Sequence, residues 1–211
     1  MAKKTSSRTY AGLSESERIQ ERKERFLEAG LEVFGTVGLR GAKVRLLCKA
    51  AGLTERYFYE SFTDTESLFL AVYEKQSSEL LQHFLTRLPQ IEGSLDERID
   101  AALTLFFQQM RDPRRVRVLH IESMVGGTKI FEQHFNYIRN AGKMAATLIR
   151  TDNPDLKQTD AVIESVALAI NHSISMLASQ WMLEDFVTPI ETLVNSAGIV
   201  IRGTMRELSS Q

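Results

Sequence analysis

Cysteine is almost absent from this sequence of 211 residues, which contains one, Cys48. A single cysteine cannot form an internal disulfide, and a lone cysteine among apolar neighbours usually packs inside a core. We therefore predict that Cys48 is buried and has no redox role.

Proline and alternating patterns are also scarce. The chain has four prolines, no segment alternates apolar and polar residues over the length of a strand, and apolar residues recur three or four positions apart. The composition, 43% hydrophobic and 25% charged, is that of a soluble globular protein with a sizeable core. These features predict an all-α fold.

Long apolar runs are missing as well. No run of 18 or more apolar residues occurs, and residues 1–8 lack the apolar stretch of a signal peptide. We therefore expect a cytoplasmic protein with no membrane partner.

The chain has little net charge, with a formal value of −1, but the charge is unevenly distributed. Residues 1–62 contain 12 Lys and Arg against 8 Asp and Glu, whereas the rest contains 14 against 19. A basic first third suits a surface that neutralises a phosphate backbone.

Capping signals mark four helix starts. The pairs Ser14/Glu17, Thr63/Glu66 and Ser94/Glu97 match the capping box, and Pro189 suits the first position of a helix. The predicted helices span residues 16–37, 43–50, 55–61, 64–88, 95–111, 114–124, 128–150, 156–183 and 189–207. Residues 1–13 are expected to form a flexible basic arm.

The most informative stretch is GLRGAKVRLLCKAAGLTERYFYESF, residues 38–62. Two short helices joined at Ala51 and Gly52 have the form of a helix-turn-helix, in which glycine permits the tight turn. Thr54 is a suitable cap for the second helix, and such a helix fits the major groove of DNA.

This stretch resembles the N-terminal domain of the TetR family of bacterial transcription regulators. The positions that match the family pattern, without a gap between Gly38 and Phe62, are Val44, Leu47, Cys48, Ala51, Gly52, Leu53, Thr54, Phe58, Tyr59 and Phe62. The resemblance implies a three-helix DNA-binding domain at residues 14–64 and a helical ligand-binding and dimerisation domain at residues 65–211. Two positions depart from the family: Ala42 replaces a frequent threonine and Thr65 a frequent lysine, which removes two expected phosphate contacts.

The partner implied is double-stranded operator DNA. We predict base contacts from Arg56 and Tyr57, phosphate contacts from Thr54 and Tyr59, and support from Lys43 and Arg45. Both tyrosines have a second interpretation as partial core residues, and the three basic residues have one as solvated surface charges.

The last two long helices carry the association signal. Apolar stripes on them, and the pairing of recognition helices that a DNA reader requires, predict a homodimer. The expected interface residues are Ile170, Ile174, Leu177, Trp181, Leu193, Ala197 and Val200.

The middle helices are rich in aromatic and methionine residues, with His120, His134, Asn171, His172 and Ser175 among them. A mostly apolar cavity with a few polar groups is typical of a small-molecule site, although the same residues also suit a core. The predicted contacts of an unidentified small-molecule effector are Phe107, Met110, Met124, His134, Phe135, Asn171 and Ser175.

Catalytic and metal chemistry are not indicated. The four histidines are scattered without metal-ligand spacing, and no serine or cysteine lies in a nucleophile motif. We expect no enzyme activity, no cofactor and no metal, and a regulator that a largely apolar ligand releases from its operator. The alternatives are a helical ligand-binding or scaffold module with a vestigial helix-turn-helix, and a DNA-binding activator.

Overall fold

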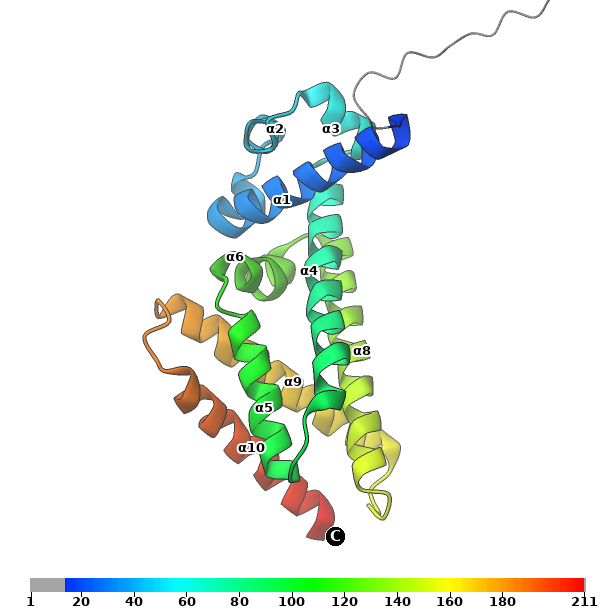
Figure 1. Cartoon of the computed structure of the whole chain (residues 1–211), viewed down its shortest axis with the longest axis vertical. Coiled ribbons are helices and arrows are strands. Elements are labelled where there is room, and N and C mark those ends of the chain that lie inside the picture. The colour runs from blue at the N-terminus through cyan, green and yellow to red at the C-terminus, as the bar shows by residue number, and fades with distance from the viewer. Residues whose placement is uncertain (1–13, 211) are drawn as a thin grey trace, which may run out of the picture.

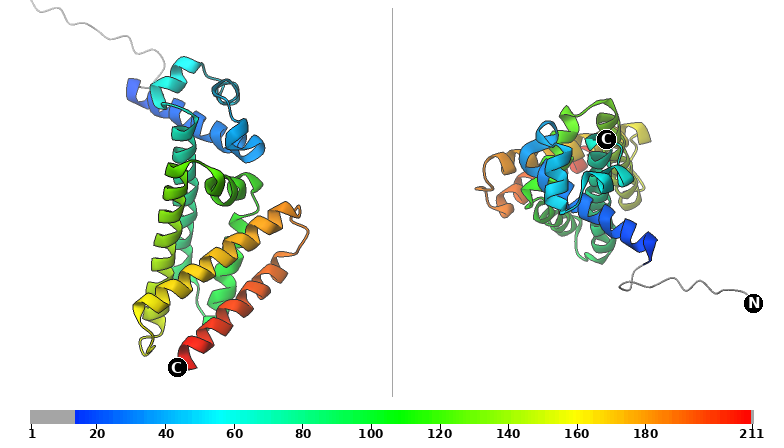
Figure 2. Two further views of the ribbon diagram at one scale, coloured as in Figure 1. Left: turned by 180° about the vertical axis from the view of Figure 1, so that it is seen from behind. Right: turned by 90° about the horizontal axis from the view of Figure 1, so that it is seen from above.

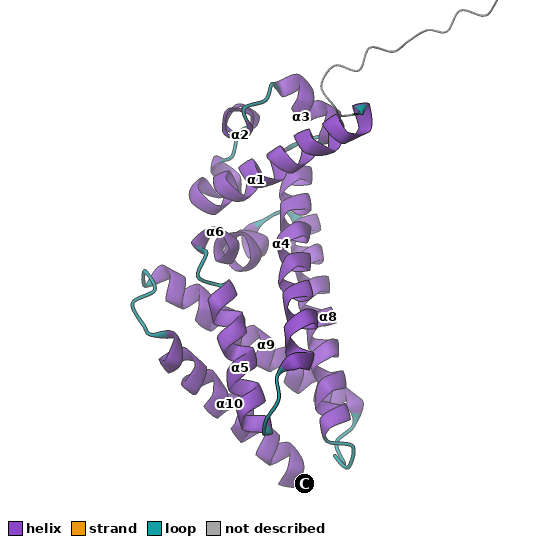
Figure 3. Cartoon of the chain, viewed as in Figure 1, coloured by secondary structure: helices purple, strands orange, loops and turns teal. Residues whose placement is uncertain are grey.

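The structure is a computed structural model that describes residues 14–210, and within that range it contains helices and no strands (Figures 1 and 3). This confirms the all-α prediction. The predicted arm, residues 1–13, lies outside the described residues.

Three helices form the N-terminal domain at one end of the molecule: α1 (Glu15–Gly41), α2 (Val44–Ala51) and α3 (Glu55–Ser61). Their core is aromatic, because the ring of Phe26 packs edge-on against Phe58 and Phe62, with centroids 5.5 and 6.2 Å apart. Edge-to-face pairs of this kind add stability beyond the area they bury.

The larger C-terminal part is built on long helices (Figure 2). The helices α4 (Thr65–Arg87) and α8 (Thr128–Asp152) run side by side away from the N-terminal domain. The helix α9 (Asp160–Leu183) packs on α8, while α5 (Leu95–Gln109) packs on α10 (Ile190–Ser210).

The region predicted as one helix at 114–124 is divided in three. It consists of α6 (Pro113–Val116), a π-helical turn η2 (Arg117–Glu122) and the short α7 (Ser123–Val125). A further short 3-10 turn, η1 (Leu88–Gln90), follows α4. The π-turn is uncommon and such turns are frequent at functional sites.

Two of the three predicted capping boxes are confirmed, at Ser14 and Ser94. The third is wrong: α4 is capped by Asp64, whose carboxylate accepts from the N–H of Ser67 at 2.7 Å. Asp caps a helix at least as well as Thr. Because Asp64 directly follows Thr63, the actual cap of α4 lies one residue after the predicted one.

The predicted end of the first helix at Gly38 is a break inside α1, since Gly38 has φ +75° and is flanked by helical turns. A side chain would be strained at this φ.

The helix α9 is unusually apolar for a helix with so little burial. Its most apolar window of 18 residues has a mean hydropathy of 1.4, which is enough by length and composition for a membrane span. Only 17% of that window is buried in the protomer. Much of its apolar surface is therefore uncovered in a single protomer.

Candidate DNA-binding and ligand-binding sites

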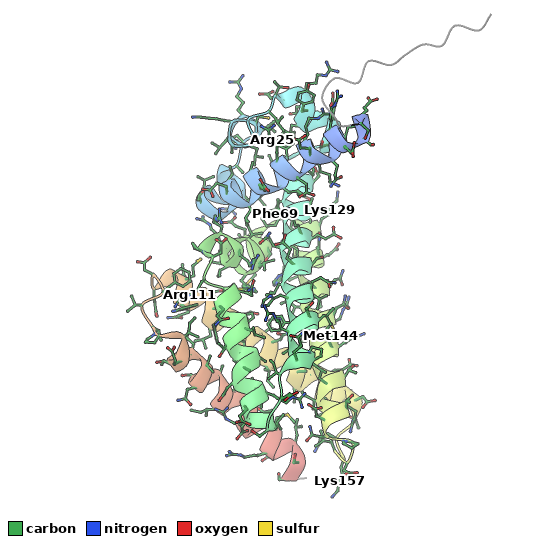
Figure 4. All side chains as sticks on the ribbon, in the orientation of Figure 1. Arg25, Phe69, Arg111, Lys129, Met144 and Lys157 are labelled. Atoms are coloured by element: carbon green, nitrogen blue, oxygen red, sulfur yellow. The ribbon has the colours of Figure 1, made fainter. Side chains whose placement is uncertain are left out.

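The turn between α2 and α3 is fixed by Gly52 and Arg25. Gly52 has the left-handed φ of +62° that ends α2. The guanidinium of Arg25, labelled in Figure 4, donates to the carbonyl of Ala51 at 2.7 and 3.1 Å and to that of Gly52 at 3.2 Å. These bonds tie the helix-turn-helix to α1, because they satisfy carbonyls that the end of α2 leaves free.

Cys48 lies inside this domain. It is 5% exposed, and burial, followed by the nearby charge of Glu55, raises the pKa of its thiol. A buried protonated thiol is unreactive, which agrees with the predicted packing role.

Most of the predicted DNA contacts lie on an exposed surface. Lys43, Arg45, Thr54, Arg56 and Tyr59 are all exposed, with Tyr59 at 59%. Thr54 occupies the cap position of α3, but its side chain makes no capping hydrogen bond. The surface they form has the side chains that backbone and base contacts require.

Tyr57 differs from the others. It is half-buried, and the guanidinium of Arg22 lies over its ring at 4.5 Å from the centroid. The ring therefore packs against α1, the partial-core interpretation given above. The base contact of Tyr57 stays a prediction. Because the ring is packed under Arg22, such a contact would have to be made by the hydroxyl group.

Acidic residues pair with the two arginines of this surface. Arg56 pairs with Glu60 at 3.0 Å, and Arg45 pairs with Glu55 at 3.4 Å. Both pairs are exposed, so breaking them costs little, and DNA can displace the carboxylates.

The end of α1 is joined to η2 by a buried carboxylate. Glu122, whose side chain is 9% exposed, accepts from the backbone N–H of Leu39 at 2.9 Å and from Nε of Arg117 at 3.0 Å. Arg117 in turn donates to the carbonyl of Thr36 at 2.7 Å. A Cβ at Gly38 would lie 2.6 Å from the Glu122 carboxylate, so the glycine is required for this contact as well.

A cavity of about 960 Å³ lies on the other side of η2. Its lining comes from η2, α7, α8, α9, the segment that follows α9, and α10. The lining residues are His120, Met124, Phe131, His134, Phe135, Ile138, His172, Ser173, Ser175, Met176, Leu177, Ser179, Gln180, Trp181, Glu184, Thr188, Thr192, Leu193 and Ser196.

Four of the predicted ligand contacts line this cavity: Met124, His134, Phe135 and Ser175. The other three do not. Phe107 and Met110 are completely buried in the core, and Asn171 is half-buried outside the lining. Periodicity marks a buried helix face but does not distinguish a packed core from a cavity wall, so ligand contacts of these three residues stay predictions that this cavity does not support.

Two histidines at the cavity wall are kept neutral. Burial, together with neighbouring His134, lowers the pKa of His120 to about 3. Burial, followed by the influence of His172, also lowers the pKa of His134, whose Nδ1 is 3.0 Å from the Tyr73 hydroxyl. Desolvation disfavours the charged imidazolium in both cases.

The predicted ligand contacts did not include His120, which the sequence analysis named among the polar residues of the middle helices, and sequence reasoning assigned no role to Glu122. Both lie in the π-turn, and no sequence signal distinguished that turn from an ordinary helix. Within residues 14–210, no group of three His, Cys, Asp or Glu side chains is arranged to hold a metal ion.

The predicted dimer residues divide into two sets. Trp181, Leu193 and Ala197 are buried in the protomer's own core, where the Trp181 indole donates to the carbonyl of Thr188 at 2.7 Å. Ile170, Ile174 and Leu177 are half-buried, and Val200 is 52% exposed. Four apolar residues of α9 and α10 are exposed and do not line the cavity, namely Val162, Leu183, Ile199 and, from the predicted set, Val200.

The fold described above agrees with comparisons to known proteins. Residues 26–72 match the family model described as bacterial regulatory proteins, tetR family. No curated protein matches the chain by sequence.

Solved structures of regulators share the fold over nearly their whole length. The fatty acid degradation regulator FadR from Bacillus halodurans is 14% identical with a TM-score of 0.73, covering 85% of this chain and 94% of its own. FadR from Bacillus subtilis, solved in complex with stearoyl-CoA, is 13% identical with a TM-score of 0.69, covering 85% and 98%. A TetR-like transcriptional regulator from Rhodococcus sp. RHA1 is 16% identical with a TM-score of 0.69, covering 87% and 95%.

The matched residues contain the turn at Gly52, the exposed helix α3 and the aromatic core that supports them. Residues 26–72 are therefore similar to the tetR family of bacterial regulatory proteins, and the chain as a whole shares the fold of the solved regulators.

Proposed function

We propose that this regulator is a homodimeric repressor that binds a near-palindromic operator through α3 and leaves it when a small, largely apolar molecule enters the cavity. The observation that carries the proposal is the position of η2. His120 of this turn lines the cavity, and Glu122 of the same turn accepts a hydrogen bond from α1 of the DNA-binding domain.

The connection through η2 gives ligand binding a short route to DNA. The carboxylate of Glu122 and the guanidinium of Arg117 both bond to the backbone at the end of α1. Arg25 joins α1 to the turn that precedes α3. A change in η2 therefore acts on the recognition helix through hydrogen bonds and rigid helices, which is the kind of two-site coupling that allostery needs.

The cavity suits a small apolar ligand. Its volume of about 960 Å³ lies at the upper end of the range of small-molecule sites. Phe131 and Phe135 stack with centroids 6.3 Å apart, and the flexible side chains of Met124 and Met176 can adapt to different shapes. FadR from Bacillus subtilis, with the same fold, was solved with stearoyl-CoA, a ligand with a long apolar chain.

The exposed face of α9 and α10 supports the dimer. Leu183 is 71% exposed, Ile199 is 61% exposed and Val200 is 52% exposed. Apolar residues gathered on two adjacent helices mark an association surface, and a two-fold dimer places two recognition helices on successive half-sites.

The direct test of operator binding uses the full chain and fragments of its own promoter. Affinity is expected to fall steeply between about 50 and 200 mM salt, because phosphate contacts release counterions. Lys43→Ala should reduce the slope of log K against log salt by about one. The matched control is Lys157→Ala, the same charge change at the opposite end of the molecule (Figure 4), which should leave the slope unchanged.

A promoter fused to a reporter distinguishes repression from activation. We expect the chain to lower expression and Arg56→Ala to restore it. Absence of binding to all genomic fragments, or a slope unaffected by Lys43→Ala, would contradict the operator proposal. Increased expression would assign the chain as an activator.

A further inference from the structure

One buried polar atom at the cavity wall has no hydrogen-bond partner. Among the described residues, Nε2 of His120 is the only fully buried side-chain nitrogen or oxygen atom without a hydrogen-bond partner. Such atoms are rare in native proteins and each one requires a reason, because burial without a partner is costly. His120 lies in the π-turn and borders the cavity, so a bound molecule is the natural source of the missing partner.

The neighbouring polar groups already have partners. Nδ1 of His134 is 3.0 Å from the Tyr73 hydroxyl, and Nδ1 of His172 is 3.0 Å from the carbonyl of Leu168. Several serine hydroxyls of the lining donate to backbone carbonyls of their own helices: those of Ser173, Ser179 and Ser196. Of the lining atoms that are fully buried, this leaves Nε2 of His120 as the one that a ligand would satisfy.

The charges of the cavity restrict the ligand further. The part of the lining that the structure describes contains no Lys or Arg. Burial keeps His120 and His134 neutral, as described above. A carboxylate or phosphate buried here would therefore lack a counter-charge, and an unpaired buried charge is strongly disfavoured.

A cationic ligand would also lack a strong counter-charge in this cavity. The one carboxylate of the lining is Glu184, an exposed residue that accepts from Nε2 of Gln180 at 2.6 Å. An exposed and already bonded carboxylate attracts a cation weakly, because solvent screens it.

We propose that the cavity selects an uncharged, mainly apolar molecule with one hydroxyl or carbonyl group, and that this group pairs with Nε2 of His120. The proposal rests on the proposed ligand function of the cavity and names the chemical class of its ligand. It assigns His120 as the residue that determines specificity, while the aromatic and methionine side chains accept different apolar bodies.

The test uses the only tryptophan of the chain as its reporter. Trp181 lines the cavity, so its fluorescence responds when the cavity is filled. The full-length protein is titrated with two sets of probes in the absence of DNA. One set has a linear ten-carbon body and the other a biphenyl body, and each comprises an alcohol, a carboxylate and an amine.

We expect at least one alcohol to bind, and to bind at least tenfold more tightly than the carboxylate and the amine on the same body. His120→Leu should weaken binding of that alcohol about three- to tenfold, the range of one neutral hydrogen bond. The matched control is His83→Leu, which removes a half-buried histidine outside the cavity and should leave every affinity unchanged. Thermal melts of both variants verify that they are folded.

Three outcomes would overturn the proposal: no binding by either alcohol, tighter binding by a carboxylate or an amine, or equal affinity of the alcohol for the wild type and His120→Leu. Binding to promoter DNA, measured on the same protein without probes, separates the two proposals. Preserved DNA binding together with any of these outcomes rejects the ligand class and leaves the operator proposal intact.

Discussion

The residues of α3 are of two kinds: some are exposed and accessible to DNA, and others pack inside the domain. Arg56 and Tyr59 are exposed, whereas Phe58 between them is completely buried and Tyr57 packs under Arg22. Reading and positioning can therefore be separated by substitution at the two exposed residues. Substituting Tyr57 would mix loss of contact with loss of packing.

Arg56→Ala and Tyr59→Phe should change DNA binding in different ways. Arg56→Ala is expected to remove about 1 to 3 kcal/mol of discrimination at one or two base pairs, because base-edge contacts carry sequence information. Tyr59→Phe removes a hydroxyl expected to face phosphate and should weaken binding to all sequences alike. Affinities on a set of singly mutated operators provide the comparison. Identical profiles for the two variants would show that these roles are misassigned.

A substitution at Glu60 should increase operator affinity, in contrast to the two substitutions above. The Glu60 carboxylate pairs with Arg56 at 3.0 Å and lies 3.7 Å from Arg22. Glu60→Gln removes a negative charge from the side of α3 that we propose faces DNA, and it frees Arg56. Operator affinity should therefore rise at low salt, and the gain should shrink at high salt. Anisotropy titrations at two salt concentrations measure this. A loss of affinity would mean that Glu60 itself contacts the operator.

His120 should make stability depend on pH. Its pKa is about 3 in the folded chain against an ordinary 6.5, so below pH 6.5 the unfolded chain takes up a proton that the folded chain does not. The stabilisation is complete above pH 6.5 and declines as pH falls toward 3, by about 1.4 kcal/mol per pH unit. His134 acts in the same direction.

Urea unfolding of the wild type and His120→Leu at pH 7.5 and pH 5.5 checks this. The variant is expected to lose less stability on acidification, because one of the two neutral histidines has been removed. Equal losses in both proteins would show that His120 is protonated in the folded chain.

At the scale of elements, long periodic helices were predictable and short irregular ones were not. Predicted and observed helices agree within a few residues from α1 to α5 and again from α8 to α10. The residues between Pro113 and Val125 were predicted as one helix because their apolar spacing is helical. The π-turn there depends on tertiary contacts, chiefly Glu122 with α1, that no local pattern records.

The sites were predictable to the same extent. The helix-turn-helix follows from a local motif, and its Gly52 and Phe58 have the expected turn and core positions. Cavity walls and dimer faces depend on which side of a helix meets which neighbour. Phe107, Met110 and Trp181 satisfy the same periodicity whether they line a cavity, pack in a core or meet a partner.

The connection between η2 and α1 can be tested with Glu122→Gln. The substitution keeps the shape but removes the charge that pairs with Arg117 and accepts from Leu39. Loss of this buried charge-assisted contact should lower the free energy of unfolding by about 1 to 3 kcal/mol and change operator affinity. The exposed Glu132→Gln is the control. Unchanged stability and unchanged operator affinity in Glu122→Gln would exclude this carboxylate as the link.

At the scale of the whole molecule, the exposed face of α9 and α10 predicts the assembly. Val200→Asp places a charge on a residue that is 52% exposed in the protomer, so the protomer fold should tolerate it while the proposed dimer should not. Leu85→Asp, at a residue 48% exposed on α4, is the matched control. Sedimentation should show a dimer for the wild type and the control and a monomer for Val200→Asp. A wild-type monomer at micromolar concentration would reject the dimer.

The hydrogen bonds from η2 to the backbone on both sides of Gly38 join the end of α1 to the turn that borders the cavity, so a movement of η2 would tilt the DNA-binding domain about this end of α1. Phe26, which packs against α3, precedes Gly38 by twelve residues, or about 18 Å of helix axis at 1.5 Å per residue. A rotation of about 5° at this end of α1 therefore moves the base of α3 by about 1.5 Å. In a dimer the two domains rotate in opposite directions, so the separation of the recognition helices changes by up to about twice that amount, against a half-site spacing of about 34 Å. The proposed release from DNA then requires only a small tilt of the DNA-binding domain as a whole about the end of α1.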